Sequence, residues 1–208
     1  MIKAVITDFD GVIRHWQNDK TRELEDICKL QRGTLSNICF DAELLQPAIT
    51  GKISFEQWQN LARERLQKSY GLAIAEHYIE AWQANGYRID HGLIDTYEEY
   101  FPEAALVLAT NATSRLPWEL QEAGLTQRFS HVFNSSAMGV AKPKKEFFYA
   151  LLMSLGINAT DALFVDDSIV NVQAAKAVGI RSLHYNGRTD LVEKLTSLSL
   201  QQSMITTL

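Results

Sequence analysis

The sequence predicts an α/β protein in which a parallel sheet lies between two layers of helices and a small all-α domain is inserted. Three observations lead to this prediction. First, short aliphatic runs that end at polar or acidic residues recur along the chain. Second, segments with the spacing of amphipathic helices separate these runs. Third, one long block near the N-terminus shows only helical patterns.

Buried strands are expected wherever a short aliphatic run ends at a polar residue. The expected strands are residues 2–7, 104–109, 162–165 and 179–184, with a weaker candidate at 131–134. Helical patterns lie between or after them at residues 114–123, 144–155, 169–178 and 189–198. This alternation predicts a Rossmann-like, three-layer core with a parallel sheet. In such sheets the site lies at the carboxyl ends of the strands, where Asp8, Thr110 and Asp166 fall.

Residues 15–90 follow a different pattern, because they contain helical segments and no expected strand. The expected helices are residues 20–30, 35–46, 54–69 and 75–85, separated by Gly33, Pro47, Gly51 and Gly71. Ser54 and Gln57 form the pattern of a capping box that opens the third helix. We therefore expect residues 15–90 to form a helical cap, inserted into an α/β core made of residues 1–14 and 91–208.

Composition excludes several classes of protein. The formal net charge of -5 argues against nucleic-acid binding, which needs a basic face to neutralise phosphates. No stretch approaches the ~18 apolar residues of a membrane span, so no membrane partner is expected. Cys28 and Cys39 form neither a CxxC pair nor a disulfide framework. Reduced thiols of this kind are typical of a cytoplasmic protein, which is the location we expect.

The segment Asp8-Phe9-Asp10-Gly11 directly follows the first expected strand. Residues two apart in an extended chain face the same side, so Asp8 and Asp10 are expected to converge while Phe9 enters the core. Two carboxylates so close repel each other and need a cation, a shared proton, or both. Taken alone, the motif fits a catalytic pair and a solvated acidic turn equally well.

Polar residues also end or follow the later segments. Thr110 and Asn111 offer a hydroxyl and backbone amides to phosphate oxygens, or they cap the next helix. Lys142 precedes a proline and is expected in a loop, where its ammonium would neutralise a phosphoryl group or face solvent. Asp166 and Asp167 suit a hard divalent cation, although acids also stabilise a helix N-terminus.

In this combination and order, the motifs resemble those of the haloacid dehalogenase-like superfamily. The resemblance covers about residues 1–14 and 91–200, and the helical block resembles the inserted cap of that family. The matching positions are Asp8, Asp10, Gly11, Thr110, Lys142, Pro143, Phe147, Asp166 and Asp167, followed by Asn171, Ala174 and Gly179. The match is specific to the superfamily and does not reach a particular substrate.

The resemblance implies a catalytic or binding role for five residues. Asp8 would attack phosphorus and form an aspartyl-phosphate, and Asp10 would act first as general acid and then as general base. Thr110, with the backbone amide of Asn111, would bind the phosphoryl oxygens. Lys142 would hold Asp8 and the phosphoryl group together. Asp10 also distinguishes reactions within the family, because the members that displace halide carry no aspartate at this position.

The implied cofactor is Mg²⁺, with Asp8, Asp10, Asp166 and Asp167 as its ligands. Asp10 would contribute its backbone carbonyl, Asp166 would bind directly, and Asp167 would bind directly or through water. The four carboxylates carry four negative charges, and Mg²⁺ and Lys142 offset three of them with three positive charges. Protonating Asp10 brings the sum to about zero, so that a phosphate dianion can enter without strong repulsion.

The sequence thus predicts a Mg²⁺-dependent phosphatase that hydrolyses a small phosphorylated metabolite. Two alternatives stay open. A phosphomutase would share these residues, and a non-catalytic protein would retain the magnesium and phosphate site without turnover. Substrate choice is expected to lie in the cap, where Lys52 follows Gly51 and would contact an anionic leaving group or face solvent. Neither the natural substrate nor the oligomeric state is predicted.

Overall fold

The structure, a computed structural model, describes residues 1–206 and contains a five-stranded parallel sheet. Its strands are β1 (Ala4–Thr7), β4 (Ala105–Thr110), β5 (His131–Asn134), β6 (Ala162–Asp166) and β7 (Arg181–His184). They lie in the order β5-β4-β1-β6-β7, and each neighbouring pair is parallel. The central position of β1 places the residues that follow it in the middle of the carboxyl edge. The predicted α/β fold is therefore confirmed.

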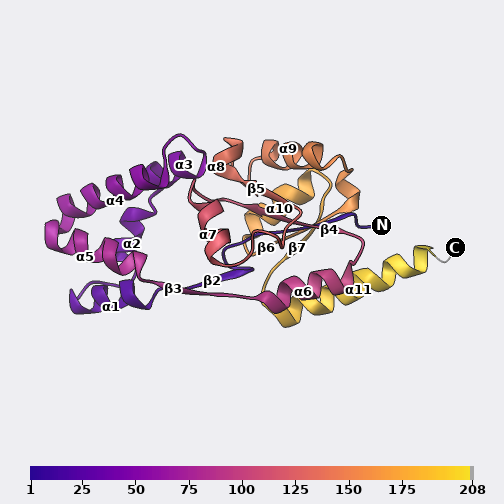
Figure 1. The fold of residues 1–208 in the computed structure, drawn as a ribbon, viewed down its shortest axis with the longest axis horizontal. Coiled ribbons are helices and arrows are strands. Elements are labelled where there is room, and N and C mark those ends of the chain that lie inside the picture. The colour runs from indigo at the N-terminus through magenta and orange to yellow at the C-terminus, as the bar shows by residue number, and fades with distance from the viewer. Residues whose placement is uncertain (207–208) are drawn as a thin grey trace.

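Helices cover both faces of this sheet, which makes three layers (Figure 1). One face carries α6 (His91–Tyr100), α7 (Leu116–Glu122) and α11 (Arg188–Thr206). The other carries α9 (Lys145–Leu155) and α10 (Ile169–Ala177). A short helix, α8 (Ser135–Met138), follows β5, and the 3-10 turn η1 (Ala159–Asp161) precedes β6. None of the described helices is long and apolar enough to cross a membrane.

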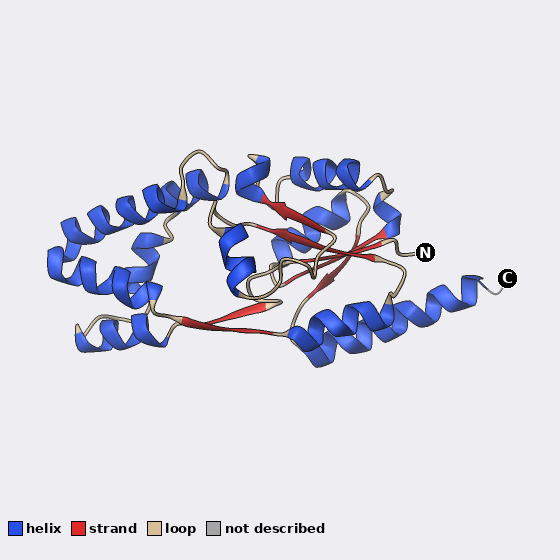
Figure 2. Cartoon of the chain, in the orientation of Figure 1, coloured by secondary structure: helices blue, strands red, loops and turns tan. Residues whose placement is uncertain are grey.

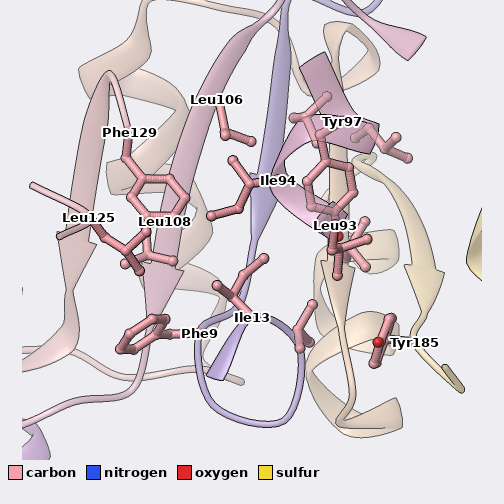
Figure 3. Close-up of a cluster of buried hydrophobic side chains, with 14 of the residues drawn as sticks. Phe9, Ile13, Leu93, Ile94, Tyr97, Leu106, Leu108, Leu125, Phe129 and Tyr185 are labelled. Carbon is pink, nitrogen blue, oxygen red and sulfur yellow. The ribbon is translucent and has the colours of Figure 1, made fainter. Parts of the chain in front are cut away.

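The alternation of side chains along the strands divides the core into two clusters. Val5 points to the face covered by α6, α7 and α11, whereas Ala4 and Ile6 point to the face covered by α9. Figure 3 shows part of the first cluster, where Phe9 lies among the labelled aliphatic and aromatic side chains. Phe9 is fully buried, as its position between two acids predicted.

The inserted block at residues 15–90, the expected cap, contains five helices, which Figure 2 shows on the side of the molecule away from the N-terminus. They are α1 (Asp19–Ile27), α2 (Thr34–Cys39), α3 (Ala42–Ile49), α4 (Phe55–Tyr70) and α5 (Leu72–Gln83). These helices share a separate cluster of buried residues that includes Leu35, Trp58, Leu66 and Tyr78. The capping box at Ser54 and Gln57 is present and opens α4.

The prediction that residues 15–90 contain no strand is wrong. The chain enters and leaves the cap through a two-stranded antiparallel ribbon, β2 (Arg14–Gln17) and β3 (Gly86–Ile89). Most of its side chains are exposed or half-buried. Its sequence therefore lacks the alternation of apolar and polar residues by which a strand is predicted. The ribbon pairs Trp16 with Tyr87, residues far apart in the sequence.

One helix prediction also needs correction, and one helix was not expected. The expected helix at residues 35–46 is two helices, because Asp41 accepts a hydrogen bond from the Glu43 amide and caps a new helix, α3. Pro47 lies inside α3 and does not end it. Helix α6 was not expected, although Asp90 caps it by accepting a hydrogen bond from the Leu93 amide. In both places the missed signal is a capping aspartate.

Candidate active site

Three carboxylates meet at the carboxyl edge of the sheet. Asp8 directly follows β1, Asp166 is the last residue of β6, and Asp167 comes next. The two strands are paired in register, which brings the residues at their ends side by side. One carboxylate oxygen of each aspartate lies within 4.8 Å of those of the other two. Asp8 and Asp166 are buried, whereas Asp167 is exposed.

The ammonium of Lys142 lies inside this acidic group. Its Nζ is 3.0 Å from Oδ1 of Asp8, donates to Oδ2 of Asp166 at 2.7 Å, and donates to the Ala109 carbonyl at 2.8 Å. The side chain is fully buried, so all three of its protons are directed to protein oxygens. Burial alone would lower the pKa of Lys142, but Asp8 and Asp166 outweigh it and raise that pKa above its ordinary value. The lysine is therefore a permanent cation of the site.

The acids of the site remain short of positive charge even with Lys142 in place. Burial raises the pKa of Asp8 to about 7, Lys142 partly opposes this, and Asp166 adds to it. Burial and the neighbouring Asp166 also raise the pKa of Asp167. A cation bound here would stabilise the ionised forms of both carboxylates and oppose the burial and the repulsion that raise their pKa values. Three hard oxygen donors at this spacing fit a divalent cation.

Asp166 and Asp167 differ in how many protein groups occupy them. Besides Lys142, Asp166 accepts hydrogen bonds from the Ser168 amide at 2.8 Å and from Asn171 Nδ2 at 3.1 Å. By contrast, among the described residues no side chain donates a hydrogen bond to the carboxylate of Asp167. A Cβ on Gly11, whose φ is +83°, would overlap this carboxylate. The chain thus keeps a place for the Asp167 side chain against Gly11 and leaves its oxygens available to a cation.

The carboxylate of Asp10 is not part of this group. Its Oδ1 accepts hydrogen bonds from Arg14 Nε at 2.7 Å and Trp16 Nε1 at 2.7 Å, and its Oδ2 accepts one from Arg14 Nη2 at 2.9 Å. Arg14 is buried and also donates from Nη1 to Glu119 at 2.8 Å. The predicted convergence of the Asp8 and Asp10 side chains is therefore wrong in this state, because a bidentate guanidinium turns Asp10 toward the ribbon.

Comparison with known proteins places this site in a family. The model of the haloacid dehalogenase-like hydrolases matches residues 2–179. The chain belongs to this family. It is 41% identical to the sesquiterpene phosphatase astK of Aspergillus oryzae over 187 residues, 88% of this chain and 89% of the relative. It is also 26% identical to the phosphatase MT3486 of Mycobacterium tuberculosis, with 95% of each chain covered.

Solved structures share the fold of this haloacid dehalogenase-like hydrolase. A HAD family enzyme from Bacteroides thetaiotaomicron, solved in complex with magnesium and inorganic phosphate, superposes with a TM-score of 0.70. It covers 90% of this chain and 96% of its own, at 20% identity. The likeness confirms the α/β core with its inserted helical domain, and the phosphatase names of the two sequence relatives agree with the predicted class of hydrolase.

The remaining predicted residues of this hydrolase differ in their burial and in the groups that they contact. Thr110 ends β4 and is buried, next to the carbonyl of Ala109 that Lys142 reaches. Asn111 uses its side chain on the backbone of Lys142: Nδ2 donates to the Lys142 carbonyl at 2.8 Å, and Oδ1 accepts from the Lys142 amide at 2.9 Å. Lys52 lies in the exposed loop between α3 and α4 and makes no ion pair within the described part of the chain.

Sequence reasoning named Asn111 and Asn171 but did not predict which residues hold others in place. Arg14, Glu119 and Asn171 each contact a predicted site residue or its partner, and the side chain of Asn111 fixes the loop of Lys142. Arg14 carried a weak signal, since it follows Asp10 by four residues at the point where the chain leaves the core. The role of Glu119 carried none, because it depends on α7 packing beside the ribbon.

Proposed function

We propose that the protein is a Mg²⁺-dependent phosphatase that hydrolyses a phosphomonoester through an aspartyl-phosphate on Asp8. The observation that carries this proposal is the ammonium of Lys142, buried between Asp8 and Asp166 within a group of three carboxylates. A carboxylate that is kept next to a fixed cation is oriented for attack on a phosphoryl group. Residues 15–90 would act as the cap and residues 1–14 and 91–208 as the catalytic core.

In the first step, a carboxylate oxygen of Asp8 forms a bond to phosphorus while the bond between phosphorus and the ester oxygen breaks. Lys142 and the amide of Phe9 both contact Oδ1 of Asp8, so Oδ2 is the oxygen that these groups leave for attack. Asp10, once protonated and released from its ion pair with Arg14, gives a proton to the departing ester oxygen. In the second step, Asp10 takes a proton from water, and the water oxygen attacks phosphorus. The bond between phosphorus and the Asp8 oxygen breaks, which frees the Asp8 carboxylate and releases phosphate.

The neighbouring residues would bind the phosphoryl group. We assign its oxygens to the hydroxyl of Thr110, the backbone amide of Asn111 and the ammonium of Lys142. Asn111 has a second, positioning part, because its side chain clamps the backbone of Lys142. Lys52 has the weakest support, since its side chain is exposed and makes no hydrogen bond or ion pair among the described residues.

Mg²⁺ would be held by Asp8, Asp166 and Asp167, with the backbone carbonyl of Asp10 as a further ligand. When bound, it supplies positive charge that neutralises the phosphoryl oxygens in the transition state. Protein donors already occupy Asp166, so Asp167 is better placed than the sequence suggested to bind the ion directly. Lys142 and the metal together would offset the acids that otherwise repel a phosphate dianion.

Phosphate release separates this proposal from its alternatives. With p-nitrophenyl phosphate and Mg²⁺ we expect steady release of inorganic phosphate, which EDTA abolishes and added Mg²⁺ restores. A phosphomutase would instead convert sugar phosphates into isomers with little net release. A non-catalytic binding protein would show binding of phosphate and no turnover with any ester. Equal activity with and without EDTA would contradict the metal assignment.

Magnesium binding should depend on pH through Asp8. A metal ligand must lose its proton, and burial raises the pKa of Asp8 to about 7. Below that pH a proton competes with Mg²⁺, so affinity should rise with pH by up to about tenfold per unit and level off above 7. Calorimetric titration at pH values on either side of 7 measures this. Equal affinity at both values would contradict the proposed part of Asp8 in metal binding.

A further inference from the structure

Aromatic rings lie close to Asp10 on the ribbon that leads into the cap. Trp16 of β2 and Tyr87 of β3 meet edge to face, with ring centroids 5.5 Å apart, and they are 40% and 37% exposed. The indole Nε1 of Trp16 donates to Oδ1 of Asp10 at 2.7 Å. In the proposed mechanism Asp10 gives its proton to the leaving group, so these rings stand beside the place where the leaving group departs.

A second aromatic pair lies where the cap meets the core. Phe55 is the first residue of α4, and Trp118 lies on α7 and is 50% exposed. The guanidinium of Arg115 lies between the two rings, 4.7 Å from the centroid of Phe55 and 4.3 Å from that of Trp118. The Phe55 amide donates to the hydroxyl of Ser114 at 3.0 Å, which ties this pair to the loop after β4.

Glu119 joins the two aromatic pairs into one network. It accepts from Arg14 Nη1 at 2.8 Å and lies 4.0 Å from Arg115 Nε. The Arg14 guanidinium in turn lies 4.4 Å from the ring centroid of Trp16. Figure 1 shows α7, which carries Glu119, between the cap helices and the sheet. A chain of contacts therefore joins Asp10 to Phe55 through Arg14, Glu119 and Arg115. Two aromatic rings lie near each end of it.

The two guanidiniums of this network are balanced by two carboxylates, and three of its rings, Trp16, Tyr87 and Trp118, are exposed. Phe55 is half-buried and packs against Trp58 and Trp82. Arg14 is paired with Asp10 and Glu119, and Arg115 lies over two rings with Glu119 4.0 Å from its Nε. Large aromatic side chains that gather in the open beside a reaction centre are typical of a site for an apolar ligand. A flat ring also contributes apolar contact at little entropic cost.

We propose that Trp16, Tyr87, Phe55 and Trp118 bind the leaving group and select a monophosphate ester of a long hydrocarbon alcohol. This inference rests on the proposed function, because it takes Asp10 as the proton donor to that leaving group. The name of the 41% identical relative, a sesquiterpene phosphatase, points to substrates of the same apolar kind. A charged or sugar leaving group would instead need partners such as Lys52.

The test compares an apolar with a polar leaving group in a protein that binds but does not turn over. The full chain carrying Asp8→Asn is titrated with farnesyl phosphate, below its micelle concentration, and with glucose 6-phosphate, both in Mg²⁺. We expect farnesyl phosphate to bind at least about tenfold more tightly. Adding Trp118→Ala should reduce this preference by about five- to tenfold, because half of the ring is open to the ligand.

A matched control is Tyr149→Ala, which removes an equally exposed ring (52%) from α9 on the other face of the sheet and should leave the preference unchanged. A second variant, Trp16→Phe, keeps a ring but removes the donor to Asp10, so it should retain more of the preference than Trp16→Ala. Glucose 6-phosphate binding as tightly as farnesyl phosphate, or Trp118→Ala acting no more than Tyr149→Ala, would overturn the inference.

Turnover by the unmutated chain tells the two proposals apart. Phosphate release from p-nitrophenyl phosphate without any preference for farnesyl phosphate would leave the phosphatase standing and remove the apolar site. Tight, Trp118-dependent binding of farnesyl phosphate without release of phosphate from any ester would support the apolar site and contradict the phosphatase.

Discussion

Replacing Asp8 by asparagine should abolish phosphatase activity, with kcat/KM on p-nitrophenyl phosphate falling by roughly 10⁴-fold or more. Asparagine has nearly the same shape as aspartate but no carboxylate, so it cannot form the bond to phosphorus. Its amide oxygen can still accept hydrogen bonds from the Phe9 amide and Lys142, which contact Oδ1 in the native site. The measurement is steady-state phosphate release at saturating Mg²⁺.

Two controls show whether a loss at Asp8 is chemical. Thermal unfolding of the Asp8→Asn variant should stay near that of the unmutated chain, because the packing around the residue is kept. Asp95→Asn removes an exposed carboxylate on α6 that pairs with Arg128, and it should leave turnover intact. Activity of the Asp8 variant within about tenfold of the unmutated chain would contradict a nucleophilic role.

Replacing Lys142 by methionine should cost both activity and stability. The ammonium lies between Asp8 and Asp166, and its side chain is fully buried. Its loss leaves two neighbouring buried carboxylates without their cation, which should lower the free energy of unfolding by about 3–5 kcal/mol. Turnover should fall by about 10³-fold or more, because the same ammonium would bind the phosphoryl group. Urea unfolding and phosphate release measure the two effects.

The stability effect of Lys142→Met should depend on metal. Mg²⁺ should restore part of the lost stability, because it supplies positive charge to the same acids. Lys144→Met is the matched control, since this lysine lies two residues away with an exposed side chain and should leave both quantities nearly unchanged. A Lys142→Met chain as stable as the unmutated one, in the absence of Mg²⁺, would contradict the electrostatic account of the site.

Much of the core could be predicted because its elements depend on local patterns. The strand at 131–134 matches β5 at both ends, and the run before Asp166 matches β6 to within one residue. The ribbon at the cap could not be predicted in this way. Its strands pair Arg14 with Ile89 and Trp16 with Tyr87, and that pairing forms only when the cap has folded back on itself. Its exposure also removes the apolar alternation that marks other strands.

The part of the site that lies at the ends of parallel strands could be predicted from the sequence. The carboxyl ends of paired strands share one edge, so Asp8 and Asp166 come together from register alone. The loop position of Lys142 followed from the proline after it. The partner of Asp10 could not be inferred, because Arg14 reaches it only after a tight turn and is held by Glu119 from a helix more than a hundred residues away. Buried ion pairs of this kind leave no periodic signal.

The central claim is that the phosphoryl group is transferred to Asp8 before water releases it. Trapping the phosphoryl-enzyme tests this claim most directly. An Asp10→Asn variant lacks the base for the second step, whereas p-nitrophenolate leaves without needing a proton, so the intermediate should accumulate. Rapid acid quenching followed by mass spectrometry of the peptides should find the phosphoryl group on Asp8, and no label when Asp8→Asn is added. A phosphoryl group on any other residue, or undiminished phosphate release by the double variant, would contradict the account.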